Sequence, residues 1–206
     1  MIKITLPNGA IKEFNADSVT GRQVAESIGP RLAKDALGVV VDGTLQDLSA
    51  PITKDASIAI VTAKAEDANA LYLCRHSAAH VMAEAITRLY PQTKLAYGPP
   101  VDNGFYYDME LDHKLTEGDF IKIEEEIKRI LAEDRPFTRY ELAKDAAFDK
   151  LNKEGNPYKL DNAQRALEAD ANAVMSFYAT GKPGENWEDL CRGPTSPPPP
   201  ASARSR

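Results

Sequence analysis

The sequence predicts an α+β protein built from two small domains. The first 62 residues contain short runs in which apolar and polar side chains alternate, as they do in half-buried strands. Two long amphipathic helices follow, and shorter elements continue as far as Trp187. A chain of 206 residues is long enough for two domains of this kind.

Residues 1–62 are expected to form the first domain. Apolar residues alternate with polar ones over residues 2–6 and again over 11–14, on either side of the turn sequence Pro7-Asn8-Gly9. This pattern predicts a β-hairpin. A short linker is expected at residues 63–68, before the second domain begins.

A short helix and further strands should complete the first domain. Ser18 is a plausible N-cap for a helix whose apolar spacing reaches Ile28 and which Gly29 can end. Strands are predicted around residues 39–41 and 57–61, where β-branched residues gather. Two strands, a helix and further strands indicate a small α+β module.

The second domain is expected at residues 69–194 and begins with a long helix. Helical spacing runs from Asn69 to Tyr90, and Pro91 stops it. The apolar stripe of this helix is predicted from the spacing of six residues: Ala78, Ala79, Met82, Ala85, Ile86 and Leu89.

A second amphipathic helix is predicted from about Thr116 to Asp134, before Pro136. Its other face mixes acidic residues with lysine and arginine, which is typical of a solvated helix surface. The residues expected to be buried on it are Phe120, Ile123, Ile127, Ile130 and Leu131.

Composition excludes several classes of protein. No run approaches the length of apolar sequence that spans a bilayer, and the amino terminus lacks a signal-peptide block, so we expect a cytoplasmic protein without membrane contact. Cys74 and Cys191 are too few and too far apart for a disulfide framework. The formal charge of −6 argues against broad binding to phosphate backbones, including DNA.

Two histidines on the first long helix form a candidate polar centre. His76 and His80 are four residues apart, so both rings project from the same helical face. This spacing suits a shared metal or a proton relay, but two ordinary surface or core histidines explain it equally well. The glutamate of the zinc-protease signature H-E-x-x-H is missing, since Ser77 stands there, which disfavours peptide hydrolysis by that route.

A second motif, Asp189-Leu190-Cys191-Arg192-Gly193-Pro194, lies near the other end of the domain. Folding could bring its cysteine and carboxylate to the two histidines, and such a set can activate water or orient an ester for hydrolysis. Cys191 could equally be a small buried apolar residue.

Four motifs together resemble the threonyl-tRNA synthetase family in order and spacing. They are Arg75-His76-Ser77-Ala78-Ala79-His80, Gly98-Pro99 with Asp102-Asn103-Gly104-Phe105-Tyr106-Tyr107-Asp108, Pro157-Tyr158-Lys159, and the motif around Cys191. Residues 1–62 resemble the TGS module that precedes the editing domain of that enzyme. The resemblance therefore implies a β-grasp domain followed by an α/β editing domain, the second additional domain of threonyl- and alanyl-tRNA synthetases.

The resemblance also implies an activity and a set of site residues. The family's editing domain hydrolyses serine from mischarged Ser-tRNA(Thr), because one methyl group gives a binding pocket too little discrimination. By analogy His76 would activate or position water, and Lys159 would stabilise developing charge. The positions expected to contact substrate are His80, Tyr107, Asp189 and Cys191.

The same resemblance shapes what we expect of cofactors. Related alanyl editing domains bind zinc with the same residue types, and zinc at His76, His80 and Cys191 is an alternative that we do not favour. We expect catalysis without a metal. The family's ATP site, its catalytic zinc and its aminoacylation core are expected to lie outside this chain, which reads as a truncated fragment whose oligomeric state is unknown.

The chain departs from the family pattern at Thr195, where a histidine is expected. Deleting one base from codons for His-Val-Pro-Ser-Thr yields Thr-Ser-Pro-Pro, which matches residues 195–198. Our hypothesis is that residues 195–206 are an out-of-frame tail, and their proline-rich composition predicts disorder. Loss of the histidine should impair the editing pocket.

Three functions remain open at this point. The first is an editing deacylase that acts on Ser-tRNA(Thr). The second is a module without catalysis that contains a TGS-like domain and binds RNA or protein, and Thr195 favours it. The third is a metal-dependent hydrolase unrelated to tRNA, which would need stoichiometric zinc.

Overall fold

The structure, a computed structural model, describes residues 1–63 and 67–197 and divides into two units. Met1–His76 and Gly193–Pro197 form the first unit, and Ser77–Arg192 belong to the second. The division falls within helix α3 (Ala68–Leu89). Both units mix helices and strands, which confirms the predicted α+β class. Half of the predicted linker, residues 64–66, lies outside the described residues.

The first unit is organised around a five-stranded sheet in the order β2-β1-β7-β4-β5. The predicted hairpin is confirmed as β1 and β2, which pair antiparallel, whereas β1 and β7 run parallel at the centre of the sheet. A short pair, β3 with β6, stands beside it. The bounds are β1 Ile2–Thr5, β2 Ile11–Phe14, β3 Val19–Thr20, β4 Ala36–Val41, β5 Thr44–Gln46, β6 Pro51–Ile52 and β7 Ala56–Thr62.

Two short helices, α1 (Gly21–Ile28) and α2 (Pro30–Asp35), belong to the first unit. The predicted N-cap at Ser18 is wrong, because the next two residues pair with β6 as strand β3 before the helix begins. Thr20 is the cap: its hydroxyl accepts from the Gln23 amide at 3.2 Å, and the Gln23 side chain accepts from the Thr20 amide at 2.9 Å. This reciprocal capping box fixes the start of the helix.

The first unit has its own apolar core between α1 and the sheet. Fully buried side chains such as Ile4, Val24 and Val39 come from β1, α1 and β4. The first turns of α3 add Leu73, which packs with Val61 of β7. These contacts explain why the start of α3 clusters with the first unit.

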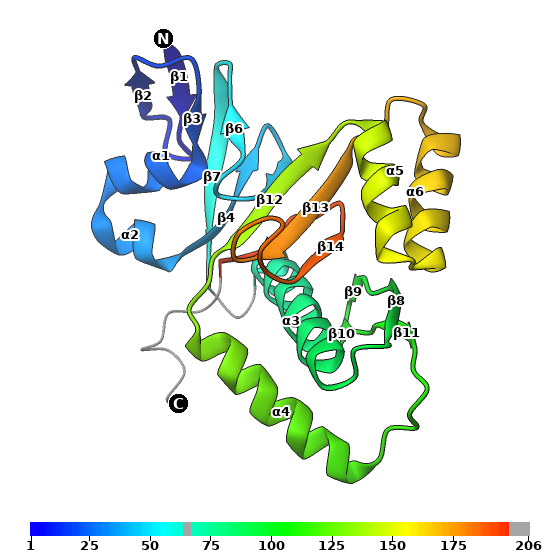
Figure 1. The fold of residues 1–206 in the computed structure, drawn as a ribbon. Helices are drawn as coiled ribbons and strands as arrows, with labels where there is room; N and C mark the ends of the chain where they lie inside the picture. Colours follow the sequence, from blue (N-terminus) through cyan, green and yellow to red (C-terminus); the bar gives the residue numbers. More distant parts are fainter. Residues whose placement is uncertain (64–66, 198–206) are drawn as a thin grey trace. The chain divides into compact units, whose positions relative to one another are not determined.

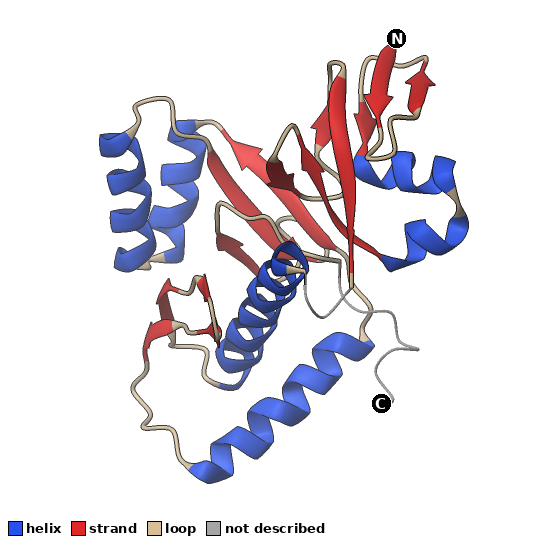
Figure 2. Ribbon diagram, turned by 180° about the vertical axis from the view of Figure 1, so that it is seen from behind, coloured by secondary structure: helices blue, strands red, loops and turns tan. Residues whose placement is uncertain are grey.

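The second unit is built on a three-stranded antiparallel sheet in the order β12-β13-β14. Helices α5 and α6 lie side by side along one face of this sheet (Figures 1 and 2) and enclose an apolar core with it. The bounds are β12 Phe137–Leu142, α5 Lys144–Glu154, α6 Pro157–Ala169, β13 Met175–Thr180 and β14 Glu188–Leu190.

Strand β13 is buried along its whole length and serves two faces. Met175 and Phe177 point into the core with α5 and α6. Tyr178 and Thr180 instead contact residues of α3, because successive side chains of a strand alternate between faces. One strand therefore joins the helical layer on one side to the histidine-bearing helix on the other.

Helix α4 (Glu117–Ala132) packs its Ile123 and Ile130 against Val81, Ala85 and Ile86 of α3. Phe120 was predicted to be buried there, but it is 53% exposed. In this first turn the buried position belongs to Asp119, which accepts hydrogen bonds from neighbouring side chains.

The apolar stripe predicted on α3 is partly wrong as well. Ala79, Ala85 and Ile86 are buried, but Ala78 is exposed. Polar side chains, His80 and Glu84, occupy part of the buried side of the helix. A prediction from hydropathy alone therefore included an exposed alanine and omitted the buried polar residues.

Two small strand pairs lie between α3 and α4: β8 with β11, and β9 with β10. Asn156, the N-cap of α6, donates to the carbonyl of Leu95, and Asn162 donates to that of Ala96, both at 2.8 Å. These bonds fasten β8 to α6. The bounds are β8 Lys94–Tyr97, β9 Pro100–Val101, β10 Gly104–Phe105 and β11 Asp108–Glu110.

The described part of the expected tail is ordered within the first unit. Thr195 and Ser196 are each 3% exposed, and the Thr195 amide donates to Oδ1 of Asp47 at 2.9 Å. The predicted disorder is therefore wrong for residues 195–197, because a buried carboxylate holds the backbone there. Residues 198–206 lie outside the described residues.

Candidate functional site

Helix α3 carries both candidate histidines, and the helix itself sets their spacing. His76 is 5% exposed and His80 is 2% exposed, so neither is the surface histidine that the spacing alone allowed. His76 is the last residue that clusters with the first unit, and His80 lies one turn further along, in the second.

The contacts of His76 fix its tautomer. Its Nδ1 lies 2.7 Å from the carbonyl oxygen of Pro194. A carbonyl oxygen can only accept a hydrogen bond, so Nδ1 carries a proton, and in the neutral form of the ring Nε2 is the basic nitrogen. An imidazole held this way has the form that a general base requires.

His80 lies among aromatic rings of the second unit. The centroids of Phe137, Tyr178 and Trp187 are 6.3, 5.9 and 5.7 Å from that of His80. The Phe137 and Trp187 rings meet it edge-on. These contacts restrict the orientation of the His80 ring. A ring held in this way is suited to form the wall of a pocket.

Cys191 directly follows β14, and β13 holds its backbone on both sides. Its amide donates to the Ser176 carbonyl at 3.0 Å, and the Ser176 hydroxyl donates to the Cys191 carbonyl at 2.6 Å. These bonds fix the position from which the thiol projects.

Three residues far apart in the sequence form a buried polar triad in the second unit. The Nζ of Lys159, from α6, lies 2.7 Å from Oδ1 of Asp189, from β14. The hydroxyl of Tyr107 donates a short hydrogen bond to the other oxygen of Asp189, and Lys159 donates to that hydroxyl at 3.3 Å. Lys159 and Asp189 are 5% and 6% exposed.

The charges of this triad are mutually consistent. Burial by itself would raise the pKa of Asp189, but the positive charge of Lys159, the nearby His80 and the two hydrogen bonds outweigh it and lower that pKa. Burial and the charge of Asp189 raise the pKa of Tyr107 well above its usual value. Asp189 is therefore an anion and Tyr107 a neutral donor, so the ammonium group of Lys159 is held in place within a buried site.

Of the six residues predicted from the sequence, His76 belongs to the first unit and the other five belong to the second. Lys159, Asp189 and Tyr107 are in direct contact, and His80 and Cys191 of the same unit have possible ligand atoms within 4.8 Å of each other. The same limit holds for His76 and His80 along α3. Imidazole and thiolate groups are zinc ligands, so the donor types of this group fit that metal.

Sequence reasoning missed a buried ion-pair network beside the site. Glu84 is completely buried on α3 and accepts from Arg88 at 2.7 Å, from Arg135 at 2.6 Å and from the hydroxyl of Thr180. Glu133 joins the network through both arginines. One feature of the sequence could have indicated this network. Glu84 lies between Ala83 and Ala85, one helical turn after His80, on a part of the helix whose other residues are mostly small or apolar.

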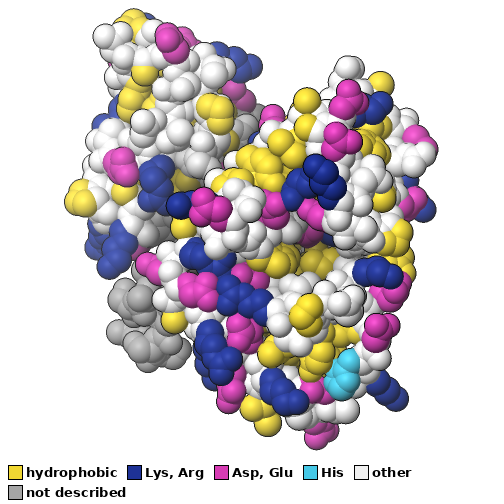
Figure 3. All heavy atoms as spheres, in the orientation of Figure 1, with side chains coloured by type: hydrophobic (Ala, Val, Ile, Leu, Met, Phe, Trp, Pro, Cys, Tyr) yellow, Lys and Arg dark blue, Asp and Glu magenta, His cyan; other side chains and the backbone are white. Residues whose placement is uncertain are grey.

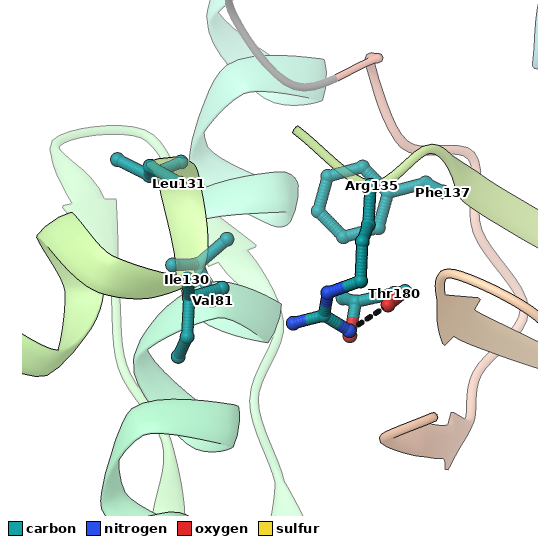
Figure 4. A pocket seen from close by; sticks show the side chains of 6 residues that line it. All are labelled: Val81, Ile130, Leu131, Arg135, Phe137 and Thr180. Carbon is teal, nitrogen blue, oxygen red and sulfur yellow. Dashed lines mark hydrogen bonds between the residues drawn. The ribbon is translucent and has the colours of Figure 1, made fainter. Parts of the chain in front are cut away.

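The network borders a small pocket, which Figure 4 shows with Arg135 reaching Thr180. The wall is mainly apolar and comes from α3, α4, β12 and β13. Its residues are Val81, Ile130, Leu131, Arg135, Phe137 and Thr180. None of them is a predicted site residue, so this pocket is a feature of the packing around the Glu84 network.

Acidic and basic side chains are interspersed on the face of the molecule in Figure 3. This agrees with the modest negative charge and with the mixed face predicted for α4. Within the described residues, no helix is both long and apolar enough to cross a membrane.

Comparison with known proteins shows which proteins the chain is similar to. Residues 2–62 match the model of the TGS domain. The chain is 46% identical over 197 residues to the threonine–tRNA ligase of Rhodospirillum rubrum, an alignment that covers 96% of the chain and 29% of the relative. The chain is homologous to the amino-terminal region of threonine–tRNA ligases.

Other threonine–tRNA ligases align in the same way. Those of Paramagnetospirillum magneticum and Syntrophomonas wolfei are 42% and 40% identical over 197 residues, again covering 96% of the chain. The chain spans about 30% of the length of these threonine–tRNA ligases. The similarity includes the TGS domain, which is a β-grasp fold as predicted, and most of the second unit.

Proposed function

We propose that this chain is an editing deacylase that hydrolyses the ester bond of Ser-tRNA(Thr). The observation that carries the proposal is the buried triad of Lys159, Asp189 and Tyr107, in a chain homologous to threonine–tRNA ligases. A buried positive charge is costly unless a negative charge lies beside it, and Asp189 supplies that charge for Lys159. The ammonium group of Lys159 can then stabilise the oxyanion that forms during ester hydrolysis.

The need for such a reaction is physical. A pocket that accepts threonine excludes serine poorly, because one methyl group is worth only about 1–3 kcal/mol of discrimination. A second, hydrolytic site removes the error after it has been made. The substrate is therefore a serine ester on the terminal ribose of tRNA(Thr).

His76 is the general base in the proposed reaction. Its Nε2 takes a proton from water as the water oxygen attacks the ester carbonyl, while the Pro194 carbonyl stabilises the imidazolium through Nδ1. The same proton then passes to the ribose oxygen as the carbon–oxygen bond breaks. Serine and tRNA are the products.

Lys159 stabilises the negative charge that develops on the carbonyl oxygen or orients the attacking water. Asp189 holds that ammonium group and the Tyr107 hydroxyl. In the proposed reaction it also selects a small hydroxylated side chain. His80 and Cys191 shape the pocket and contact the substrate, and Tyr107 packs near the terminal adenosine.

The proposed reaction needs no metal. A zinc ion would be held by His76, His80 and Cys191, and it would act as a Lewis acid on the ester or lower the pKa of bound water. His76 already has the tautomer of a base without it. We expect elemental analysis to find less than one zinc ion per chain. We also expect a chelator to leave the hydrolysis rate unchanged.

The experiment is deacylation of Ser-tRNA(Thr) by the wild-type chain, His76→Ala and His113→Ala. His113 is the matched control because its side chain is 46% exposed and bonds to Asp119, away from the triad. We expect His76→Ala to lower the rate by about 10²–10⁴-fold, as loss of a general base does. His113→Ala should keep the wild-type rate.

Two outcomes would contradict the proposal. Equal rates for wild type and His76→Ala would remove the base from the mechanism. A wild-type rate no faster than hydrolysis in buffer, restored by Thr195→His, would mean that the present chain is disabled at that position. It would then favour the second candidate, an RNA- or protein-binding module, for which Thr195 is the supporting observation.

A further inference from the structure

The position of Tyr107 depends on a residue that has no side chain. Tyr107 lies in the short connection between β10 and β11, and the pairing of β8 with β11 shifts register directly after it, between Asp108 and Met109. Regular strand pairing therefore does not fix the tyrosine ring. Its hydroxyl nevertheless has to reach Asp189 and Lys159.

Gly98, directly after β8, supplies the surface on which the ring rests. A Cβ atom built on Gly98 would lie within 2.7 Å of three carbons of the Tyr107 ring, Cγ, Cδ2 and Cε2. Real Cβ atoms essentially never come closer than 3.0 Å to another heavy atom. The ring therefore occupies the space that any other residue at position 98 would fill.

This requirement for glycine is steric. The φ angle of Gly98 lies outside the left-handed range, unlike those of Gly104 and Gly155, so alanine can adopt its backbone conformation. Substitution by alanine thus adds one methyl group against the ring and changes little else at that position.

We propose that Gly98 is a positioning residue for Tyr107 in the editing reaction. The inference rests on the proposed function. The missing side chain lets the ring lie against the backbone, and in that position the hydroxyl donates to Asp189 while accepting from Lys159. A methyl group there displaces the ring, and ordinary contact begins only near 3.4 Å. The triad then loses its neutral donor.

The test is a double-mutant cycle with Gly98→Ala, Tyr107→Ala and the two together, each made in the full 206-residue chain. Unfolding in urea is followed by the fluorescence of Trp187, the chain's single tryptophan. Gly118→Ala is the matched control, since a Cβ there would find its nearest neighbour, Oγ1 of Thr116, at 3.9 Å.

We expect Gly98→Ala to lower the urea midpoint in the wild-type background and to leave it unchanged in the Tyr107→Ala background, where there is no ring to displace. Gly118→Ala, at the second residue of α4, should not lower the midpoint, because alanine is favoured over glycine in a helix. Equal losses in the two backgrounds would overturn the proposal, because the methyl group would then be acting on something other than the ring.

Hydrolysis of Ser-tRNA(Thr) by the same proteins tests the link to the reaction. A displacement of roughly 1 Å in an active site can cost about 100-fold in rate, which is the loss expected for Gly98→Ala. The double variant should be no slower than Tyr107→Ala. An undiminished rate in Gly98→Ala would overturn the positioning role. If even the wild-type chain hydrolyses nothing, the proposed function fails, and the urea cycle still decides whether Gly98 positions the ring.

Discussion

Replacement of Glu84 by alanine should destabilise the second unit more than any change of an exposed charge. The carboxylate is 1% exposed, and it faces the guanidinium groups of Arg88 and Arg135 and the hydroxyl of Thr180. Its removal leaves those donors without their shared acceptor. It also leaves a space on α3 one turn after His80.

The size of the effect follows from the burial of each partner. Removing one member of a buried ion pair costs about 3–5 kcal/mol, since the remaining charge is left uncompensated. Arg88 is 34% exposed and keeps Glu126 and Glu133, whereas Arg135 is 15% exposed and, among the described carboxylates that hold it, keeps only Glu133. The lower end, about 3 kcal/mol, is therefore expected.

Urea unfolding followed by Trp187 fluorescence measures this loss. With a slope of about 2 kcal/mol per molar urea, the midpoint should fall by roughly 1.5 M. Glu84→Gln keeps an acceptor for Thr180 and should lose about half as much. Asp161→Ala, which removes an exposed ion pair to Arg165 on α6, is the control and should stay within about 0.5 kcal/mol of wild type. A Glu84→Ala midpoint equal to that of the control would refute the reasoning.

Three further predictions test other parts of the fold. Ile123→Ala should cost about 2–4 kcal/mol by the same urea assay, whereas Phe120→Ala, at an exposed position, should cost less than about 1 kcal/mol; equal losses would contradict the packing of α4. Thr20→Ala should weaken the start of α1 by about 1 kcal/mol, seen as faster amide exchange in its first turn, and unchanged exchange would contradict the capping box. Hydrogen bonds, first of all from His113, hold the pKa of Asp119 far below its usual value, so its stabilising contribution is present above about pH 4 and is lost as the pH falls further. Asp119→Asn should therefore flatten the acid side of the stability curve, and an unchanged curve would argue against this account.

Much of the fold could be predicted because its signals are local. The hairpin, the long helix ended by Pro91 and the second helix before Pro136 all follow from short-range patterns in the sequence. The errors arose where distant residues decide the outcome. Ser18 and Thr20 are equally good caps in isolation, and only the pairing of β3 with β6 selects Thr20.

The site was predicted less completely. Resemblance to a family brought Lys159, Asp189 and Tyr107 into one set, and their contact in the structure gives that set a physical basis. Nothing in the local sequence shows that Glu84 is buried, because its two arginines come from α3 itself and from the segment after α4. Gly98 could be marked only as part of a motif, since its role depends on a ring nine residues away.

The two faces of β13 have different roles, which protein engineers can use. One face packs in the apolar core, and the other contacts residues of the candidate site and of the Glu84 network. Met175 and Phe177 pack in the apolar core that α5 and α6 cover, so libraries at these positions should tune thermal resistance while sparing turnover. Ser176, Tyr178 and Thr180 bear on Cys191, His80 and Glu84, so diversity there should change selectivity. Deleting one residue from this strand would exchange the two sets and abolish both properties together.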